Sequence, residues 1–168
     1  MAKHILRISV PILLLALSSG SCRHAVEPNP DEGRIVINQS IDGLTFGDDT
    51  LTVIKKLGPP NRSSYNGPES VAFFYIQGRH ATMYLSINLN PVSHGGVNII
   101  EVTSPYAGKT SAGIGLGSKR QEVWSKIGKP SSSDTFQLGW YDSYDSGTNE
   151  TLIEFQNDVV TRIRMFGG

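Results

Sequence analysis

The sequence predicts an α+β fold made of two tandem repeats, each a short helix packed on a three- to four-stranded antiparallel meander. Three observations lead to this fold class. Two segments of the 168-residue chain match each other, each carries the boundary signals of a helix, and alternating apolar and polar residues follow both. We therefore expect the first repeat over residues 35–104 and the second over 105–168.

The internal match relates Gly43–Pro60 to Gly113–Pro130 without a gap. Both segments open with a glycine-bounded pentapeptide, GLTFG in the first and GIGLG in the second. Both end in an aliphatic residue followed by glycine, one further residue and proline. Chance can place two such endings in a glycine-rich chain, but it hardly reproduces the apolar spacing between them as well, so the match indicates a repeat.

A short helix is expected within each matching segment. Asp48 and Ser118 are suitable N-caps, because their side-chain oxygens can accept hydrogen bonds from the first turn. Gly58 and Gly128 stand where a left-handed residue ends a helix, with proline soon after. A helix of about ten residues does not persist alone in water, so each needs an apolar stripe against a sheet. The expected stripes are Leu51, Ile54 and Leu57 in the first helix and Val123, Trp124 and Ile127 in the second.

Alternation after each helix predicts strands. In Thr82–Leu89, Met83 and Leu85 fall on one face and Tyr84 on the other. This pattern is typical of an antiparallel sheet with one face on a core. The expected strands are Val71–Ile76, Thr82–Leu89 and Val97–Val102 in the first repeat and Phe136–Tyr141, Thr151–Phe155 and Val159–Met165 in the second, and Arg34–Ile37 could add an edge strand to the first.

The first 21 residues have the layout of a secretory signal peptide. Lys3 and Arg7 give a positive start, Ile8–Leu17 is an apolar run broken by a serine and a proline, and small residues follow. The apolar run is shorter than the ~20 residues that cross a bilayer, which argues against a membrane-spanning helix. Residues 1–21 are therefore predicted to be a cleaved leader.

Cys22, the only cysteine, stands directly after the expected cleavage point. This arrangement resembles the bacterial lipoprotein signal, which implies that Cys22 is the lipid attachment residue. Ser19 occupies the position where that signal usually has leucine. Simple secretion with an unpaired thiol is the alternative. The implied location is the bacterial cell envelope, with the chain lipid-anchored on a periplasmic or outer-membrane face.

Residues 22–34 read as a flexible tether, because Arg23–Arg34 is polar, contains two prolines and shows no apolar periodicity. An irregular first segment of the folded domain is the alternative. Loss of Lys3 and Arg7 with the leader leaves 13 basic and 15 acidic residues. No basic stripe remains, which argues against a nucleic-acid partner. A single cysteine cannot form a disulfide within the chain, so packing must supply the stability.

A capped helix that ends in leucine-glycine-x-proline and precedes a meander resembles the fold shared by the SmpA/OmlA small outer-membrane lipoproteins and the β-lactamase inhibitor proteins. Gly43–Pro60, Gly113–Pro130, Val97–Val102 and Val160–Met165 carry this resemblance. Two departures stand out: those inhibitor proteins hold disulfides within their repeats, and the first helix of the pair common to both families is not evident here. No functional residue can be carried over, so the resemblance implies a fold and leaves function open.

Motifs for catalysis or metal binding are weak. Ala107–Thr110 lacks the earlier glycine and the following helix of a phosphate-binding loop. The acidic loop with Asp142, Asp145, Asn149 and Glu150 fails the EF-hand spacing and is typical of a solvated hairpin. His24, His80 and His94 are scattered, and no nucleophile elbow is present. We expect no catalytic residue, metal or cofactor, and hence no enzyme.

Aromatic residues on or beside the predicted strands are the remaining functional candidates. Exposed tyrosine and tryptophan often anchor protein interfaces, since they bury a large area at little entropic cost. The alternative is that they pack between the repeats or under a loop. The candidate interface residues are Tyr75, Tyr84, Trp140, Tyr141, Tyr144 and Arg79.

The predicted function is that of a non-catalytic cell-envelope lipoprotein that acts as a protein-binding or scaffolding module. Its expected partners are the membrane, through the N-terminal lipid, and another envelope protein. An inhibitor of a secreted or periplasmic enzyme, acting through the same aromatic face, is the alternative, and an uncharacterised hydrolase is a third.

Overall fold

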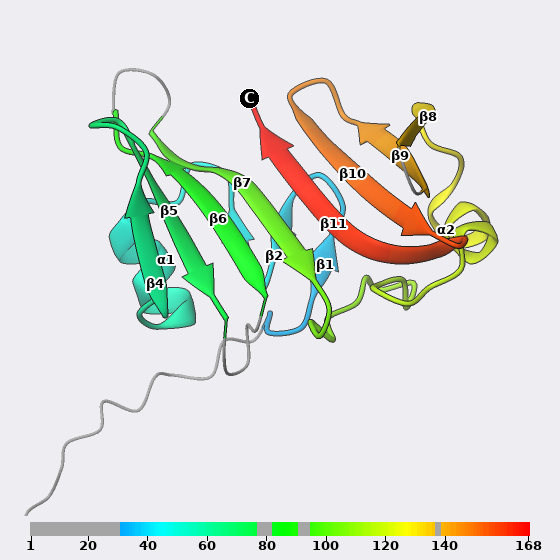
Figure 1. Cartoon of the computed structure of the whole chain (residues 1–168), viewed down its shortest axis with the longest axis horizontal. Coiled ribbons are helices and arrows are strands. Elements are labelled where there is room, and N and C mark those ends of the chain that lie inside the picture. Colours follow the sequence, from blue (N-terminus) through cyan, green and yellow to red (C-terminus); the bar gives the residue numbers. More distant parts are fainter. Residues whose placement is uncertain (1–30, 77–81, 91–94, 137–138) are drawn as a thin grey trace, which may run out of the picture.

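An eight-stranded antiparallel sheet dominates the computed structural model, which describes residues 31–76, 82–90, 95–136 and 139–168 (Figure 1). Its spatial order is β4-β5-β6-β7-β11-β10-β9-β8, so the two halves of the chain meet where β7 pairs with β11. The strands are β4 (Arg62–Tyr65), β5 (Ser70–Tyr75), β6 (Met83–Asn88), β7 (Gly96–Thr103), β8 (Ser132–Phe136), β9 (Gly139–Asp145), β10 (Asn149–Gln156) and β11 (Val159–Gly167).

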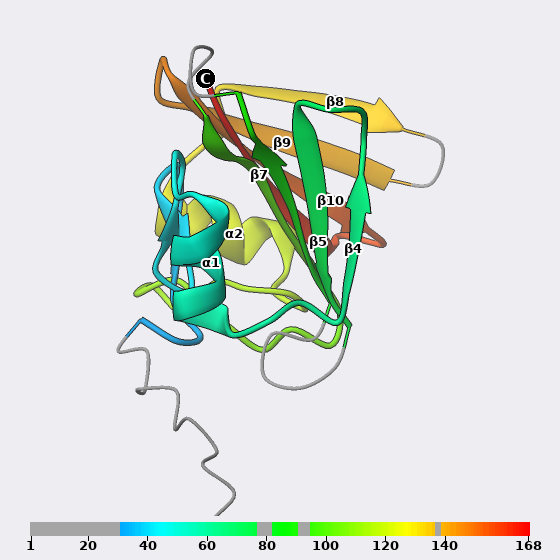
Figure 2. The ribbon, with the colours of Figure 1, turned by 90° about the vertical axis from the view of Figure 1, so that its left-hand side faces the viewer.

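Both described helices and a small three-stranded sheet lie on one side of the large sheet (Figure 2). We call this side of the large sheet the inner face and the opposite side the outer face. No described segment covers the outer face. The covering elements are β1 (Ile35–Val36), β2 (Ser40–Ile41), β3 (Leu44–Thr45), α1 (Thr50–Leu57) and α2 (Arg120–Ile127).

The expected fold of two tandem α+β repeats is wrong. The chain is mostly β, and its strands form one continuous large sheet and one small sheet instead of two helix-covered meanders. The large sheet is continuous because Ile99–Thr103 of β7 pairs in register with Arg162–Phe166 of β11. Alternation along a strand shows which side chains are buried, but it does not show which strand lies next to it.

The strand boundaries also differ from expectation at three places. Phe136 and Gly139 pair across the β8–β9 connection, so the expected strand Phe136–Tyr141 spans two strands instead of forming one. The short edge strands β4 and β8 were not expected. β4 is mostly exposed and β8 almost entirely so, and their sequences therefore lack the alternation of apolar and polar residues that predicts a strand. Arg34–Ile37 does not extend the large sheet, because Ile35 and Val36 pair with β2 in the small sheet.

Helices do form within both matching segments, and glycine ends each of them as expected. Gly58 has φ 80° and Gly128 has φ 107°, backbone angles that favour glycine. The expected N-caps are wrong by one residue: Asp49 caps α1 by accepting from the Thr52 N–H at 2.7 Å. Lys119 stands at the N-cap of α2 without a side-chain hydrogen bond, while Ser118 Oγ accepts from the Gly115 N–H.

The apolar stripes of the helices are narrower than expected. In α1, Val53 and Leu57 are buried, whereas Leu51 is 75% exposed. In α2 only Val123 is fully buried, and Trp124 is 38% exposed. The helices therefore contribute few side chains to the core, because the small sheet fills much of the space on the inner face.

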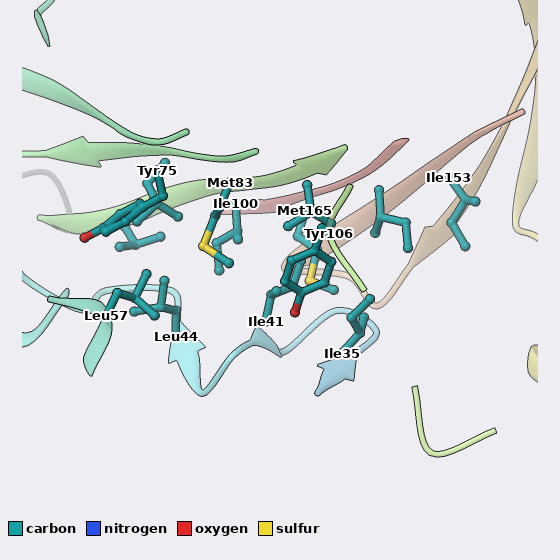
Figure 3. Packing of buried hydrophobic residues seen from close by; sticks show 14 of the residues in the cluster. Ile35, Ile41, Leu44, Leu57, Tyr75, Met83, Ile100, Tyr106, Ile153 and Met165 are labelled. Atoms are coloured by element: carbon teal, nitrogen blue, oxygen red, sulfur yellow. The ribbon is translucent and has the colours of Figure 1, made fainter. Parts of the chain in front are cut away.

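A single apolar core lies between the inner face and the elements that cover it (Figure 3). Small-sheet residues and Leu57 project toward side chains of both halves of the large sheet, so both halves share one core. Burying this common surface stabilises the fold mainly by removing apolar area from water. Core residues seen from close by include Ile35, Ile41, Leu44, Leu57, Tyr75, Met83, Ile100, Tyr106, Ile153 and Met165.

The expected leader, Cys22 and most of the expected tether lie outside the described residues. The expected boundary between repeats, at residues 104–105, falls in the connection between β7 and α2. Among the described helices, neither combines the length and the apolar content needed to span a bilayer.

Candidate functional site

The outer face of the large sheet is the candidate functional surface, because it combines aromatic and charged side chains and no described segment covers it (Figure 2). Antiparallel register places one residue from each strand in a row across this face. From one edge to the other, this cross-strand row runs Arg62, Phe74, Tyr84, Glu101, Arg164, Leu152, Ser143 and Ser132.

An ion-pair network occupies the middle of the outer face. Glu101 on β7 pairs with both Arg164 and Arg162 on β11, and Arg162 also pairs with Glu154 on β10 at 3.1 Å. Both glutamate side chains are 16% exposed and the two arginines 30–37%. Two cations balance two anions, so the network carries no net charge and crosses the β7–β11 junction.

An aromatic platform, formed by Phe74 and Tyr84, lies beside this network. Their ring centroids are 5.2 Å apart with the planes tilted by 53°, and the centroid separation lies in the range typical of interacting aromatic pairs. The Arg62 guanidinium lies 4.7 Å from the Phe74 ring centroid. Within the described part of the chain, no carboxylate pairs with Arg62. This end of the outer face therefore presents a cation stacked on an aromatic ring, the residue types that anchor many interfaces.

Tyr141 lies on the same face at the other end of the sheet, opposite Asp134 on the edge strand β8. Its hydroxyl donates a long hydrogen bond of 3.4 Å to the Asp134 carboxylate. The negative charge of Asp134 raises the pKa of the Tyr141 phenol above its ordinary value. Tyr84 and Tyr141 are thus the two candidate interface tyrosines that the fold brings to the outer face.

Tyr75 and Tyr144 are not surface residues, which corrects their expected place in an interface. Tyr75 is 3% exposed and Tyr144 is 8% exposed, and both point to the inner face. Their hydroxyls donate to the carbonyls of Gly58 and Gly128, at 2.9 and 3.2 Å respectively. Each therefore ties the end of one helix to the sheet. Arg79 lies outside the described residues.

Trp140 belongs to a cluster near α2 that sequence reasoning did not find. Asp142, fully buried, accepts two hydrogen bonds from Arg120 at 2.6 and 3.2 Å. It also accepts one from the Trp124 indole at 2.7 Å and one from the Ser133 hydroxyl at 2.7 Å. The Arg120 guanidinium lies 4.7 Å from the Trp124 ring centroid and 4.8 Å from that of Trp140. We call these five residues the Asp142 cluster.

No sequence signal could have revealed this cluster. Asp142 was expected in a solvated acidic loop, but it lies within β9 and points to the inner face opposite Ile153. Its partners come from α2, β8 and β9, which only tertiary structure brings together. In the described ranges, no three His, Cys, Asp or Glu side chains converge in a way that could hold a metal ion.

The chain matches no protein-family model and no curated protein. Solved structures with a similar fold include a DUF4309 family protein, YjgB, from Bacillus subtilis. That structure has 14% identity and a TM-score of 0.53, over 77% of this chain and 86% of that one. A cysteine-rich secretory protein from Staphylococcus aureus has 11% identity and the same TM-score. The match covers 83% of this chain but 48% of that one, so this chain corresponds to about half of that protein.

A candidate beta-lactamase inhibitor protein from Streptococcus mutans also matches, with 13% identity over 70% of this chain and 82% of that one. Its TM-score of 0.29 is too low to support a common fold. Identities of 11–14% show a likeness of fold alone. The chain therefore shares its architecture with the two proteins at 0.53, and its membership in the SmpA/OmlA or inhibitor families stays a prediction.

Proposed function

We propose that this chain is a non-catalytic lipoprotein of the bacterial cell envelope that binds another envelope protein through the outer face of its large sheet. The observation that carries the proposal is this face, which presents Arg62, Phe74 and Tyr84 beside a charge-balanced network. The leader-like N-terminus and the fold likeness to a secretory protein support an extracytoplasmic location.

The size of the outer face suits a stable complex. Eight strands about 4.8 Å apart and about six residues long present roughly 34 by 20 Å, or roughly 700 Å². A standard interface buries about 800 Å² on each partner. Because Glu101 and Glu154 balance Arg162 and Arg164 within the face, a partner can cover this network without leaving an unpaired buried charge.

The position of the N-terminal side of the fold also supports this proposal. β1, the first described strand, belongs to the small sheet on the inner face (Figure 2). A lipid on Cys22 would tether the chain from that side. The outer face, on the opposite side of the large sheet, would then remain accessible to a partner.

Site-specific photo-cross-linking in living cells tests this function. A photoreactive phenylalanine at position 84 or 141 should give cross-linked adducts of higher mass with another envelope protein. The same amino acid at position 51, on exposed α1 on the opposite side, is the matched control and should give none. Adducts from position 51 with none from 84 or 141 would contradict the proposal. A soluble secreted enzyme as the adduct would instead support the inhibitor function.

A further inference from the structure

We propose that the hollow between the end of α2 and β8 binds an acidic sugar residue. Trp124, Lys129, Pro130 and Ser133 line this hollow, whose volume is about 270 Å³. Pockets that hold drug-sized ligands are about 300–1,000 Å³, so a single ring is the appropriate size of ligand. The hollow adjoins the Asp142 cluster on the inner face, and it is therefore separate from the surface proposed above.

Trp124 provides a fixed aromatic wall. Its indole N–H donates to Asp142 at 2.7 Å, and the Arg120 guanidinium lies 4.7 Å from its ring centroid. These two contacts restrain the ring while 38% of the residue remains exposed. A ligand that stacks on a ring already held in place loses less of its binding energy to ordering the protein.

Ser133 is held by the same carboxylate. Its hydroxyl donates to Asp142 at 2.7 Å, so the serine oxygen keeps a lone pair that can accept from a ligand hydroxyl. Asp142 is fully buried and receives donors from Arg120, Trp124 and Ser133. The wall and the polar group of the hollow are thus positioned together by one buried residue, as in pre-organised binding sites.

The charge of the site favours an anion. Asp142 and Arg120 neutralise each other, whereas Lys129 is exposed and pairs with no carboxylate in the described ranges. A positively charged ligand would be repelled by Lys129. The Arg120 guanidinium also already occupies one face of the Trp124 ring, so that face is closed to a cationic ligand. A uronic-acid ring offers a C–H face for the indole, a hydroxyl for Ser133 and a carboxylate for Lys129. These three features match three of the four residues that line the hollow.

Tryptophan fluorescence gives a direct test, because the chain has two tryptophans and both contact Arg120. The purified full-length chain is titrated with a trisaccharide of galacturonic acid. We expect a saturable change in emission. Lys129→Gln should weaken the affinity about tenfold, since a charge-assisted hydrogen bond is lost. Unchanged emission at millimolar trisaccharide, or equal affinity in this variant, would overturn the proposal.

Three controls separate the proposed ligand from other sources of binding. Lys126→Gln makes the same charge change on α2, where the lysine pairs with Glu122, and should leave the affinity unchanged. A neutral glucose trisaccharide should bind at least tenfold more weakly than the acidic one. A triglutamate peptide should also bind at least tenfold more weakly. Equal binding of either probe would overturn the assignment to an acidic sugar, whatever the outcome of the cross-linking experiment.

Discussion

Asp142 shows how hydrogen bonds and an ion pair can offset the cost of burying a charged side chain. Burying a carboxylate without hydrogen-bond partners is strongly unfavourable, but here four donor groups surround Asp142. Its main partner, Arg120, is also nearly buried, with 12% of the side chain exposed. The Asp142 cluster fixes the relative position of α2, β8 and β9, since Arg120, Ser133 and Asp142 come from these three elements.

Asp142→Asn is expected to lower the free energy of unfolding by about 3 kcal/mol. The amide is similar in size, but it leaves the Arg120 charge buried without a carboxylate. Urea denaturation at neutral pH measures the effect. Glu122→Gln is the control, because it breaks an exposed pair with Lys126 and should change stability by less than about 1 kcal/mol. Similar losses in the two variants would contradict the importance of the buried pair.

Two tyrosines of the large sheet connect the sheet to the helix ends by hydrogen bonds. Tyr75 and Tyr144 donate to the carbonyls of Gly58 and Gly128, which would otherwise be unpaired at a helix C-terminus. Burial raises the pKa of both phenols, and that of Tyr144 reaches about 12. The folded state therefore binds the phenolic proton more tightly than the unfolded chain does.

Stability is expected to fall at alkaline pH for this reason. A phenol in the unfolded chain ionises near pH 10. The contribution of Tyr144 is complete below that pH and is lost as the pH rises from about 10 to about 12. Urea midpoints measured at pH 8 and pH 11 should decline less for Tyr144→Phe than for the unsubstituted protein. An identical decline in both proteins would show that this phenol does not control the alkaline transition.

At the scale of elements, α1 buries fewer side chains than the helical spacing of its apolar residues predicts. Leu51, Ile54 and Leu57 recur at helical spacing, yet only Leu57 reaches the core. The buried face is instead formed by Val53 and Leu57, because the small sheet covers the adjacent part of the inner face. In this short helix, the stripe of buried side chains is therefore narrower than the stripe of apolar residues in the sequence.

Leu57→Asp is expected to destabilise the fold by at least about 3 kcal/mol, because an unpaired charge would enter the core. Leu51→Asp places the same charge on the exposed side of the same helix. Its effect should stay within about 0.5 kcal/mol. Thermal unfolding followed by circular dichroism distinguishes the two variants. Equal melting temperatures for both would refute the orientation of α1.

At the scale of the whole molecule, the β7–β11 pairing determines the architecture. Core side chains such as Ile100 and Ile163 lie on its inner face, while Glu101 and Arg164 pair on its outer face. This junction joins two four-stranded halves into one surface about eight strands wide. Neither half alone would present an outer face large enough for the proposed complex.

Membrane attachment is the whole-molecule property that the sequence predicts most directly. Cys22→Ser should move the protein from the membrane fraction to the soluble fraction, because the predicted lipid attachment site is lost. Ser19→Leu supplies the leucine that is usual in lipoprotein signals and should keep the protein in the membrane fraction. Cell fractionation followed by immunoblotting measures both. Membrane retention of the serine variant would exclude the lipid anchor.

Local features of this chain could be predicted from its sequence. The helices before Gly58 and Gly128, and strands such as β6 and β10, follow from capping, glycine conformation and alternation, which depend on neighbours along the chain. Of the candidate interface residues, Tyr84 and Tyr141 lie on the outer face, whereas Tyr75 and Tyr144 lie in the core. Alternation separates the two faces of a strand, but it does not indicate which face a helix covers.

The sequence by itself determined the positions of both helices and of most long strands, and the leader stays a prediction. Only the tertiary structure decided that β7 pairs with β11, that β1–β3 form a separate sheet and that Asp142 meets Arg120. The physical reason is the range of the interactions. Caps, turns and alternation act over a few residues, whereas sheet order, a shared core and buried ion pairs join residues that are distant in sequence.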